Sequence, residues 1–486
     1  MIQHLFHLST DKPVTLQQQV YESISNGILD GHISPDIPLP STRQLSKMLA
    51  ISRNTVVIAY QNLTADGYLL PKDRAGFYVD KNILKGKPGN TQPLDITANS
   101  QPDWESLVSF NRVTNTIKRA QNWQEQPYPF VYGQLDPDLF PFQHWRECSL
   151  DSVRILPAKN WLSDHYDSDD PLLITQIKSR LLPRRGIWAE NDEILVTVGA
   201  QNAIFMTLYA LLNNRSTLGV ENPGYPDLYQ IANQSGANIK PLAIDSQGLI
   251  INEQINTCNL LFTTPSHQFP TTVTMPLERR KQLLQKATEH DFLIIEDDYE
   301  NEISFESTPL PALKSFDADN RVIYIGSLSK TLSPGLRLGY IVAPKPFINV
   351  LREIRCLMLR HPAMNNQKAV GLFLERGYYH SLVTKLVAVY KERWKIMNTS
   401  INMYLPDYLS QPLIGGSACW IEGPKHLNAK TLKSIASDHG IIIESGEKFY
   451  AGDQIPLHTF RLGYSSIKTD KIDSGILKLS NLAINI

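Results

Sequence analysis

The chain has 486 residues, of which 42% are apolar and 20% are charged, and its formal net charge is −1. This length predicts about two to four folding units. The composition excludes a disordered chain and a fibrous repeat, and the near-neutral charge gives no overall sign of nucleic-acid binding. The sequence has no run of about 18 apolar residues, no signal-like N-terminus and no CxxC pair among its four cysteines, so we expect a reduced, cytoplasmic protein without a membrane segment, disulfide framework or metal site.

Residues 1–80 predict three short helices followed by a β-hairpin. Apolar side chains recur at intervals of four between residues 16 and 30, which indicates one buried face of a first helix. Ser41 or Thr42 can cap a second helix and Ser52 a third, because short hydroxyl side chains accept hydrogen bonds from the free amides of a helix start. The segment YLLPKDRAGFYVD then reads as two short strands around a turn. This order of elements is the winged helix-turn-helix arrangement.

The start of the third helix is the candidate contact to DNA. The window between Asp36 and Asp66 carries three basic residues and no acid. Short polar side chains and exposed amides at a helix start can meet phosphates and base edges, and arginines in the second helix and the wing can contact the DNA backbone. The predicted DNA-binding residues are Arg43, Ser52, Arg53, Asn54, Thr55 and Arg74. The alternative is a head that only packs on the body and dimerises it, with these arginines as ordinary surface charges.

A second, larger α/β domain is predicted over residues 105–486, after a linker at residues 81–104. The linker segment lacks helical or strand periodicity and is rich in Lys, Gly, Pro, Asn and Gln. Beyond it, apolar strand-like runs such as EILVTVG, FLIIEDDYE and VIYIGSLS alternate with amphipathic helix-like runs. Such alternation is typical of a mostly parallel sheet wrapped by helices.

Lys330, which follows the strand-like run VIYIGSLS, is the centre of the candidate site in this domain. Ligands of doubly wound sheets bind at the carboxyl ends of the strands, which is where this lysine falls. A lysine can hold pyridoxal 5'-phosphate (PLP) as a Schiff base, and the nearby Ser327, Ser329 and Arg337 can bind its phosphate. A lone lysine would be an ordinary solvated charge, so the prediction depends on these neighbours.

Two further strand ends supply predicted site residues. Asp297 closes the apolar run FLIIEDD, and a carboxylate beside the PLP ring nitrogen would keep that nitrogen protonated. Gly199, Ala200 and Gln201 follow the run EILVTV and open a helix, whose free amides can bind phosphate without a charged side chain. Taken singly, Asp297 could cap a helix and the glycine segment could be a routine turn.

Two stretches of the sequence resemble known families. The GntR-type DNA-binding head is resembled by LPSTRQLSKMLAISRNTVVIAYQNLTADGYL, and this likeness covers residues 13–80. The PLP-lysine segment of fold-type I aminotransferases is resembled by GSLSKTLSPGLRLGY, and the likeness to these enzymes covers residues 105–486. The fusion resembles the MocR/GabR family of transcription regulators. This resemblance implies a double-stranded DNA operator, an amino-acid-like effector sensed with PLP, and a domain-swapped, head-to-tail homodimer.

The resemblance also implies roles for further residues. Tyr299 would hydrogen-bond the ring hydroxyl, Tyr225 would stack on the cofactor ring, and Arg461 would grip an acid group by a two-point contact. Tyr166 in WLSDHYDSDDPLL resembles a tyrosine that reaches the phosphate of a neighbouring subunit. A core tyrosine and a surface ion pair are the alternatives for Tyr225 and Arg461. The fitting effectors carry an amine and an acid group, as amino acids, ω-amino acids and aminosulfonates do, while PLP itself is another candidate signal.

Two departures from the aminotransferase pattern bear on turnover. Aminotransferases usually read NPTG where this chain has Phe269-Pro270-Thr271-Thr272, so the usual Asn is missing and Thr272 takes a position that favours glycine. The tyrosine loop around Tyr166 also lacks its expected glycine. We therefore expect PLP binding with slow or incomplete transamination.

Three functions are compatible with these features. The first is a PLP-dependent, DNA-binding transcription regulator whose effector displaces Lys330 and thereby repositions the heads. The second is an active aminotransferase with an accessory head, and the third is a DNA-binding protein whose body is only a dimerisation scaffold. An intact recognition helix favours regulation over enzymology alone, and intact Lys330, Asp297 and Arg337 argue against the scaffold.

Overall fold

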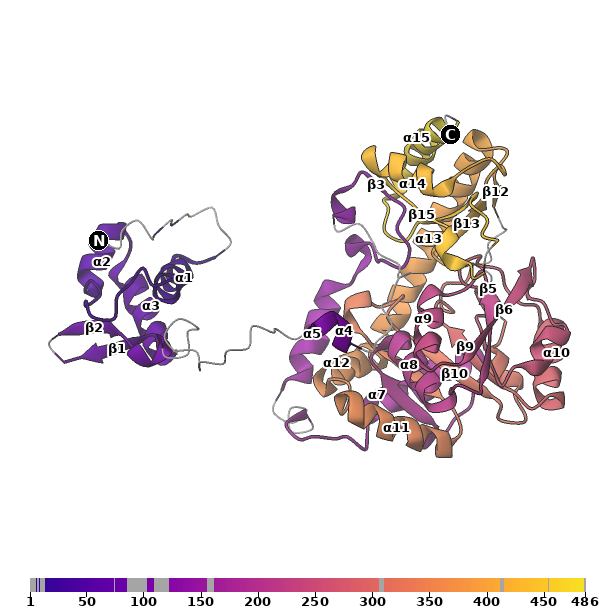
Figure 1. The fold of residues 1–486 in the computed structure, drawn as a ribbon, viewed down its shortest axis with the longest axis horizontal. Coiled ribbons are helices and arrows are strands. Elements are labelled where there is room, and N and C mark those ends of the chain that lie inside the picture. The colour runs from indigo at the N-terminus through magenta and orange to yellow at the C-terminus, as the bar shows by residue number, and fades with distance from the viewer. Residues whose placement is uncertain are drawn as a thin grey trace. The chain divides into compact units, whose positions relative to one another are not determined.

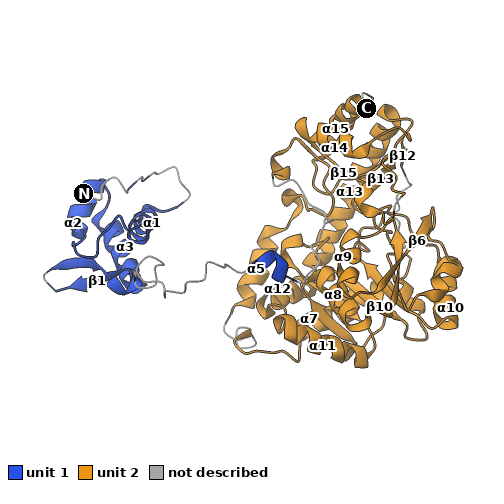
Figure 2. Cartoon of the chain, in the orientation of Figure 1, with its two compact units in different colours: residues 1–108 blue, residues 109–486 orange. Residues whose placement is uncertain are grey.

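The computed structural model describes residues 6, 8, 14–73, 75–84, 103–108, 122–154, 161–305, 310–410, 415–452 and 454–484. The chain divides into two compact units, residues 1–108 and residues 109–486 (Figure 2). Residues 85–102 of the expected linker lie outside the described residues, as does Arg74 of the expected DNA contacts. The domain limits at residues 80 and 104 therefore stay predictions.

The first unit contains the predicted three helices and wing (Figure 1). Its main elements are α1 (Leu16–Leu29), α2 (Thr42–Leu49), α3 (Arg53–Ala65), β1 (Leu69–Lys72) and β2 (Gly76–Val79). The strands β1 and β2 pair antiparallel, and a short 3-10 turn (Lys81–Leu84) and α4 (Trp104–Leu107) follow them along the chain. The winged helix-turn-helix prediction is confirmed.

Side-chain caps and an apolar core explain where these helices lie. Ser41 Oγ accepts a hydrogen bond from the Gln44 amide at 3.2 Å, and the Gln44 side chain accepts one from the Ser41 amide at 2.9 Å, so α2 begins with a capping box. Ser52 Oγ accepts from the Asn54 amide at 3.2 Å and starts α3. The buried core of the unit includes Val20, Ile24, Ile28, Leu45, Val56 and Leu63. These contacts leave the starts of α2 and α3 facing solvent.

An eight-stranded sheet lies at the centre of the second unit, with the strand order β4-β11-β10-β9-β8-β5-β6-β7. The strands are β4 (Ile194–Thr197), β5 (Thr217–Asn222), β6 (Asn238–Asp245), β7 (Gly248–Leu249), β8 (Leu260–Thr263), β9 (Leu293–Asp298), β10 (Val322–Ser327) and β11 (Gly339–Val342). From β10 through β9, β8 and β5 to β6 the neighbours run parallel, whereas β11 is antiparallel to β10 and β4, and β7 is antiparallel to β6. The predicted mostly parallel sheet is confirmed.

Helices cover both faces of this sheet (Figure 1). The helices of this part of the unit are α5 (Phe142–Ser152), α7 (Pro171–Gln176), α8 (Gly199–Leu211), α9 (Pro226–Gln234), α10 (Leu277–Glu289), α11 (Lys345–Leu359), α12 (Met364–Glu375) and α13 (Tyr378–Tyr404). Successive strand residues point to opposite faces. In β9, Ile295 packs with residues of α8 and α11, whereas Ile294 packs with residues of α10. Because both faces are buried, the strands are continuous apolar runs in the sequence.

The C-terminal part of the second unit adds a four-stranded antiparallel sheet with the order β12-β13-β16-β15. Its strands are β12 (Leu409–Ser410), β13 (Ala418–Glu422), β15 (Glu444–Ser445) and β16 (Thr459–Gly463), and the helices α14 (Ala429–Asp438) and α15 (Ile472–Ala483) also belong to this part. The strand β14 (Ile441–Ile442) pairs with β3 (Tyr128–Pro129), which ties the start of the unit to its end. No helix within the described ranges is long and apolar enough to cross a membrane.

Candidate functional site

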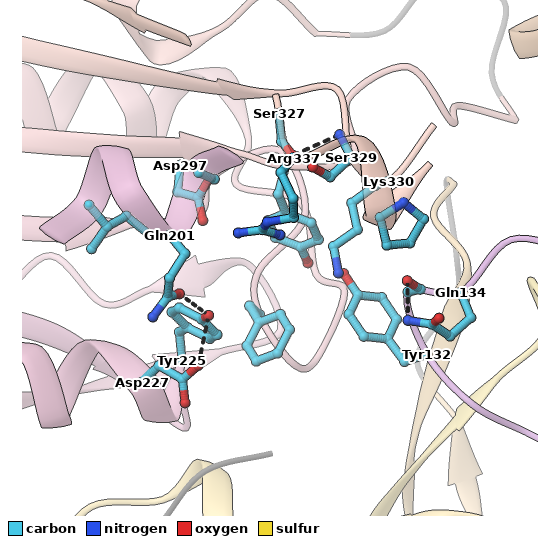
Figure 3. A pocket seen from close by; sticks show the side chains of 16 residues that line it. Tyr132, Gln134, Gln201, Tyr225, Asp227, Asp297, Ser327, Ser329, Lys330 and Arg337 are labelled. Atoms are coloured by element: carbon cyan, nitrogen blue, oxygen red, sulfur yellow. Dashed lines mark hydrogen bonds between the residues drawn. The ribbon is translucent and has the colours of Figure 1, made fainter. Parts of the chain in front are cut away.

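A cavity of about 360 Å³ opens where β9 and β10 end and α8 begins (Figure 3). The predicted residues that line it are Ala200, Gln201, Tyr225, Asp297, Tyr299, Ser327, Ser329, Lys330 and Arg337. Gly199 lies beside the cavity, since a Cβ atom on it would come within 3.1 Å of Arg337 Nη2. The fold therefore brings together residues that are far apart in the sequence.

Lys330 lies in the turn after β10 and points toward Tyr132 (Figure 3). Its Nζ atom is 4.4 Å from the centre of the Tyr132 ring. Gly133 leaves room for this amine, because a Cβ atom there would lie 2.5 Å from Nζ. Gly133 also has a φ of +68°, a conformation that side chains disfavour. Glycine is therefore required at position 133 both by the backbone and by Lys330.

Asp297 is the penultimate residue of β9 and is buried. Burial and, to a smaller extent, the charge of Asp298 raise the pKa of the Asp297 carboxyl to about 7, while the Lys330 amine acts in the opposite direction. Within the described part of the chain, no group hydrogen-bonds the Asp297 Oδ1 atom. Because an unpaired buried carboxylate is costly, this oxygen suits a ligand that brings a cation or an N–H group into the cavity.

The start of α8 and the turn after β10 form an anion site. Gly199 opens the helix with a φ of +77°, and the free amides and partial positive charge of a helix start favour a phosphate there. Arg337 is exposed, and its Nη2 donates to the Val198 carbonyl at 3.3 Å. Ser329 Oγ has no hydrogen-bond partner among the described residues. Helix amides, a guanidinium and a hydroxyl together match the chemistry of a phosphate dianion.

Aromatic side chains form the walls of the cavity. The Tyr225 hydroxyl donates to the Gln201 side chain and, at 3.1 Å, to the Asp227 carboxylate. The rings of Tyr225 and Tyr299 each meet the Phe269 ring edge-on, with centroids 5.4 and 5.8 Å apart. Burial raises the pKa of both tyrosines well above the ordinary value, so their hydroxyls stay protonated and can donate hydrogen bonds.

Arg461 lies against the wall of the cavity. Its guanidinium carbon is 3.9 Å from the centre of the Tyr132 ring and 4.6 Å from that of the Phe269 ring, and both rings line the cavity. The side chain is only 1% exposed and forms an ion pair with Glu444. The surface ion pair considered from the sequence is therefore wrong, because both partners are buried.

Tyr166 lies apart from these residues. Its side chain is 53% exposed, and it does not line the cavity of its own chain. The prediction that it reaches the phosphate of a neighbouring subunit stays a prediction.

The altered NPTG-like segment has visible consequences. The Phe269 ring lines the cavity, so an apolar side chain stands where aminotransferases have a polar Asn. Thr272 has a φ of +66°, the left-handed region in which a β-branched residue is strained by about 1–3 kcal/mol. The expectation that this position favours glycine agrees with its backbone geometry.

Sequence reasoning missed six residues that line the cavity, namely Tyr132, Gly133, Gln134, Ile204, Asp227 and Pro334. The segment that carries Tyr132 and Gly133 is held next to β16, because the Gly463 amide donates a hydrogen bond to the Phe130 carbonyl at 3.0 Å. An aromatic residue followed directly by glycine, in PFVYG, was the available signal. Asp227 follows Tyr225 by two residues and could have been found as an acid in the first turn of α9.

The predicted DNA-binding residues of the head gather at two helix starts. Arg43 lies in the first turn of α2, and Arg53 and Asn54 begin α3, and all three side chains are exposed. Ser52 is an exposed cap, and Thr55 is half-buried. Their contact with DNA stays a prediction.

Comparisons with known proteins match both units. Residues 16–79 match the family model of bacterial regulatory proteins of the gntR family, and residues 166–479 match that of the aminotransferases of class I and II. The HTH-type transcriptional regulator TauR of Rhodobacter capsulatus is 38% identical over 98% of this chain and 98% of its own. The probable rhizopine catabolism regulatory protein MocR of Rhizobium meliloti is 29% identical over 83% of this chain and 80% of its own. The chain belongs to the MocR/GabR-type transcription regulators.

The body of this MocR/GabR-type regulator also has solved structural relatives. The α-aminoadipate aminotransferase LysN of Thermus thermophilus, complexed with N-(5'-phosphopyridoxyl)-L-leucine, is 26% identical, with a TM-score of 0.68 over 73% of this chain and 92% of its own. The predicted fold-type I aminotransferase architecture is confirmed. A regulator of this type therefore combines a DNA-binding head with an aminotransferase-like body.

The close approach of Gly133 and Lys330 gives a first test. We expect Gly133→Ala to displace the lysine and strain the backbone, which would cost about 1–2 kcal/mol and lower cofactor retention about five- to thirtyfold. Retention is measured as protein-bound PLP absorbance after dialysis. Gly335→Ala is the matched control, because a Cβ atom there lies no closer than 3.8 Å to Ser333 Oγ. Equal retention in both variants would contradict the assigned contact.

Proposed function

We propose that this regulator holds PLP covalently on Lys330 and that an effector carrying an amine and an acid group displaces the lysine, which changes how the heads bind operator DNA. The observation that carries the proposal is the Asp297 carboxylate, buried in the same cavity as the Lys330 amine with its Oδ1 unbonded among the described residues. A ring nitrogen that carries a proton is the partner that this oxygen needs.

The residues of the cavity fit PLP group by group. The amides of Gly199 and Ala200 with Arg337 and Ser329 would hold the phosphate, and Asp297 would hold the ring nitrogen. Tyr299 would donate to the ring hydroxyl, and Tyr225 would pack on the ring. When bound, PLP supplies an aldehyde carbon that exchanges one primary amine for another. Lys330 would hold the cofactor through its amine, and the primary amine of an effector would compete with Lys330 for the same carbon.

The acid group of the effector is inferred from Arg461. A guanidinium offers a planar fork of donors, and this one stacks on the Tyr132 and Phe269 rings that line the cavity. Amino acids, ω-amino acids and aminosulfonates carry both required groups. PLP itself is a further candidate signal, since its phosphate and aldehyde fit the cavity without an effector.

Operator binding and dimer formation complete the proposal. The exposed Arg43 and Arg53, with the polar start of α3, would contact the phosphates and base edges of double-stranded DNA. The exposed Tyr166 suits a contact across a homodimer, in which each head would cross over the partner's body. A ligand can move the heads only as far as its affinity differs between the two states of the body.

An active aminotransferase is the second candidate, because Lys330, Asp297 and Arg337 share one cavity. Two features favour regulation instead. Phe269 removes a polar group from the cavity wall, and the head carries a helix, α3, whose exposed polar start transamination does not need. We therefore expect an effector to bind with slow or incomplete transamination.

Replacing the lysine tests the cofactor assignment. We expect Lys330→Ala to lose the visible absorbance of covalently held PLP and the effector response, because the variant lacks the amine that points into the cavity. Lys345→Ala is the matched control, since Lys345 is exposed and pairs with Asp192 on the surface. A yellow Lys330→Ala protein with an unchanged spectrum would overturn the assignment.

Replacing the head arginines tests the DNA contact. We expect Arg43→Ala and Arg53→Ala to weaken operator binding and to make its salt dependence shallower by about one unit per lost phosphate contact, with the PLP spectrum unchanged. Lys81→Ala removes an exposed charge elsewhere in the head and serves as the control. Operator affinity equal to that of the unmodified protein in both arginine variants would refute the head assignment.

A further inference from the structure

Arg461 is already held by a carboxylate of its own chain. Glu444 on β15 lies directly opposite Arg461 on β16 in the antiparallel register. Glu444 Oε2 is 2.8 Å from Arg461 Nε and 2.6 Å from Nη2, and the two side chains are 9% and 1% exposed. A buried guanidinium needs a counter-charge, which Glu444 provides here.

A third charge lies next to this pair. Lys448, in the 3-10 turn Glu447–Phe449, follows Glu444 by four residues, and its Nζ is 3.9 Å from Glu444 Oε1. Its side chain is 12% exposed. Burial lowers the pKa of Lys448 to about 8, an effect that Glu444 opposes and Arg461 adds to. Glu444 therefore lies between two cations and contacts Arg461 more closely than Lys448.

The arrangement creates a conflict for an acidic effector. Arg461 stacks on Tyr132 and Phe269 of the cavity wall, so an acid group that reaches it brings a second anion to a guanidinium that Glu444 already neutralises. Two carboxylates that share one buried cation repel each other. A shift of about 1 Å would bring Glu444 Oε1 into a normal ion-pair distance from Lys448, which relieves that repulsion.

We propose that Glu444 exchanges partners, pairing with Arg461 in the absence of effector and with Lys448 once the effector's acid group occupies Arg461. This inference rests on the proposed function of the cavity. Glu444 and Lys448 are then specificity residues: an amine without an acid group leaves Glu444 on Arg461, and only an acid-bearing amine drives the exchange. Phe449 links the two states, since Arg461 and Lys448 both lie against its ring, at 4.8 and 5.3 Å.

Two other charged groups, Glu447 and Lys433, also act on Lys448. Glu447, on the same turn, accepts a hydrogen bond from Ser445 Oγ at 3.0 Å, and Lys433 of α14 adds a positive charge. Lys448 also lines a second cavity of about 350 Å³, together with residues of α9 and β6.

The test uses full-length, PLP-loaded protein and three amines: propylamine, 3-aminopropanoate and 2-aminoethanesulfonate. In both acids two methylene groups separate the amine from the acid group, and counterparts with one or three methylene groups extend the series. Dissociation constants are measured by calorimetry and by the change in PLP absorbance. The variants are Glu444→Gln, Lys448→Met and the double variant, with Glu447→Gln as the control that removes a neighbouring carboxylate outside the ion pair.

We expect the unmodified protein and Glu447→Gln to bind the acid-bearing amines more tightly than the plain amines. In Lys448→Met, the ratio of plain-amine to acid-bearing-amine dissociation constants should fall roughly tenfold, which is within the range usual for coupled groups. Plain-amine binding should stay unchanged. Glu444→Gln should keep or increase the preference, because no repulsion remains. In the Glu444→Gln background, Lys448→Met should have no further effect, which is the signature of the exchange.

Two results would overturn the exchange. One is an equal loss from Lys448→Met in both backgrounds, which would make Lys448 only a distant positive charge. The other is an unchanged preference in both single variants, which would make the trio purely structural. Failure of the proposed function looks different: in the unmodified protein, either no amine alters the PLP absorbance or acid-bearing and plain amines bind equally. Unchanged plain-amine binding in each variant reports an intact cavity.

Discussion

The buried carboxylate of Asp297, which lines the same cavity as Lys330, is the group around which the site is arranged. A carboxylate removed from water is stable only if it is neutralised or paired, and burial already raises the pKa of this one to about 7. A carboxyl with this pKa is only partly ionised near neutral pH, and none of the described residues hydrogen-bonds its Oδ1 atom. A cationic ring nitrogen would restore the ionised form, so the cofactor's affinity and its electronic state depend on the same contact.

The sheet explains why the other groups converge on this carboxylate. Asp297 pairs with Ile325 in the parallel register of β9 and β10, so the turn that carries Lys330 begins beside it. The chain then returns along β11, antiparallel to β10, which brings Arg337 back to the same edge. Because β4 is the next strand and α8 follows it, Gly199 arrives beside Arg337. The antiparallel connection between β10 and β11 and the turn between β4 and α8 thus bring together both ends of the site.

Local chemistry made much of this predictable from the sequence. Continuous apolar runs marked the buried strands, and Ser41 and Ser52 marked helix starts, because those signals lie within a few residues. Gly133 and Glu444 were not predictable in that way, since their roles come from tertiary packing against Lys330 and from the register of a two-residue strand. The family resemblance predicted Arg461 as a site residue, whereas its buried ion pair with Glu444 emerged only from the folded chain.

Locking the cofactor onto the lysine tests the central claim most directly. Borohydride would reduce the proposed covalent PLP–Lys330 link, so that no amine could take the lysine's place while the cavity stays filled. Operator binding is then measured, with and without an acid-bearing amine that shifts the absorbance of the untreated protein. The account predicts that reduced protein binds the operator as untreated, effector-free protein does and no longer responds to the amine. An undiminished response of the reduced protein would contradict lysine displacement as the signal.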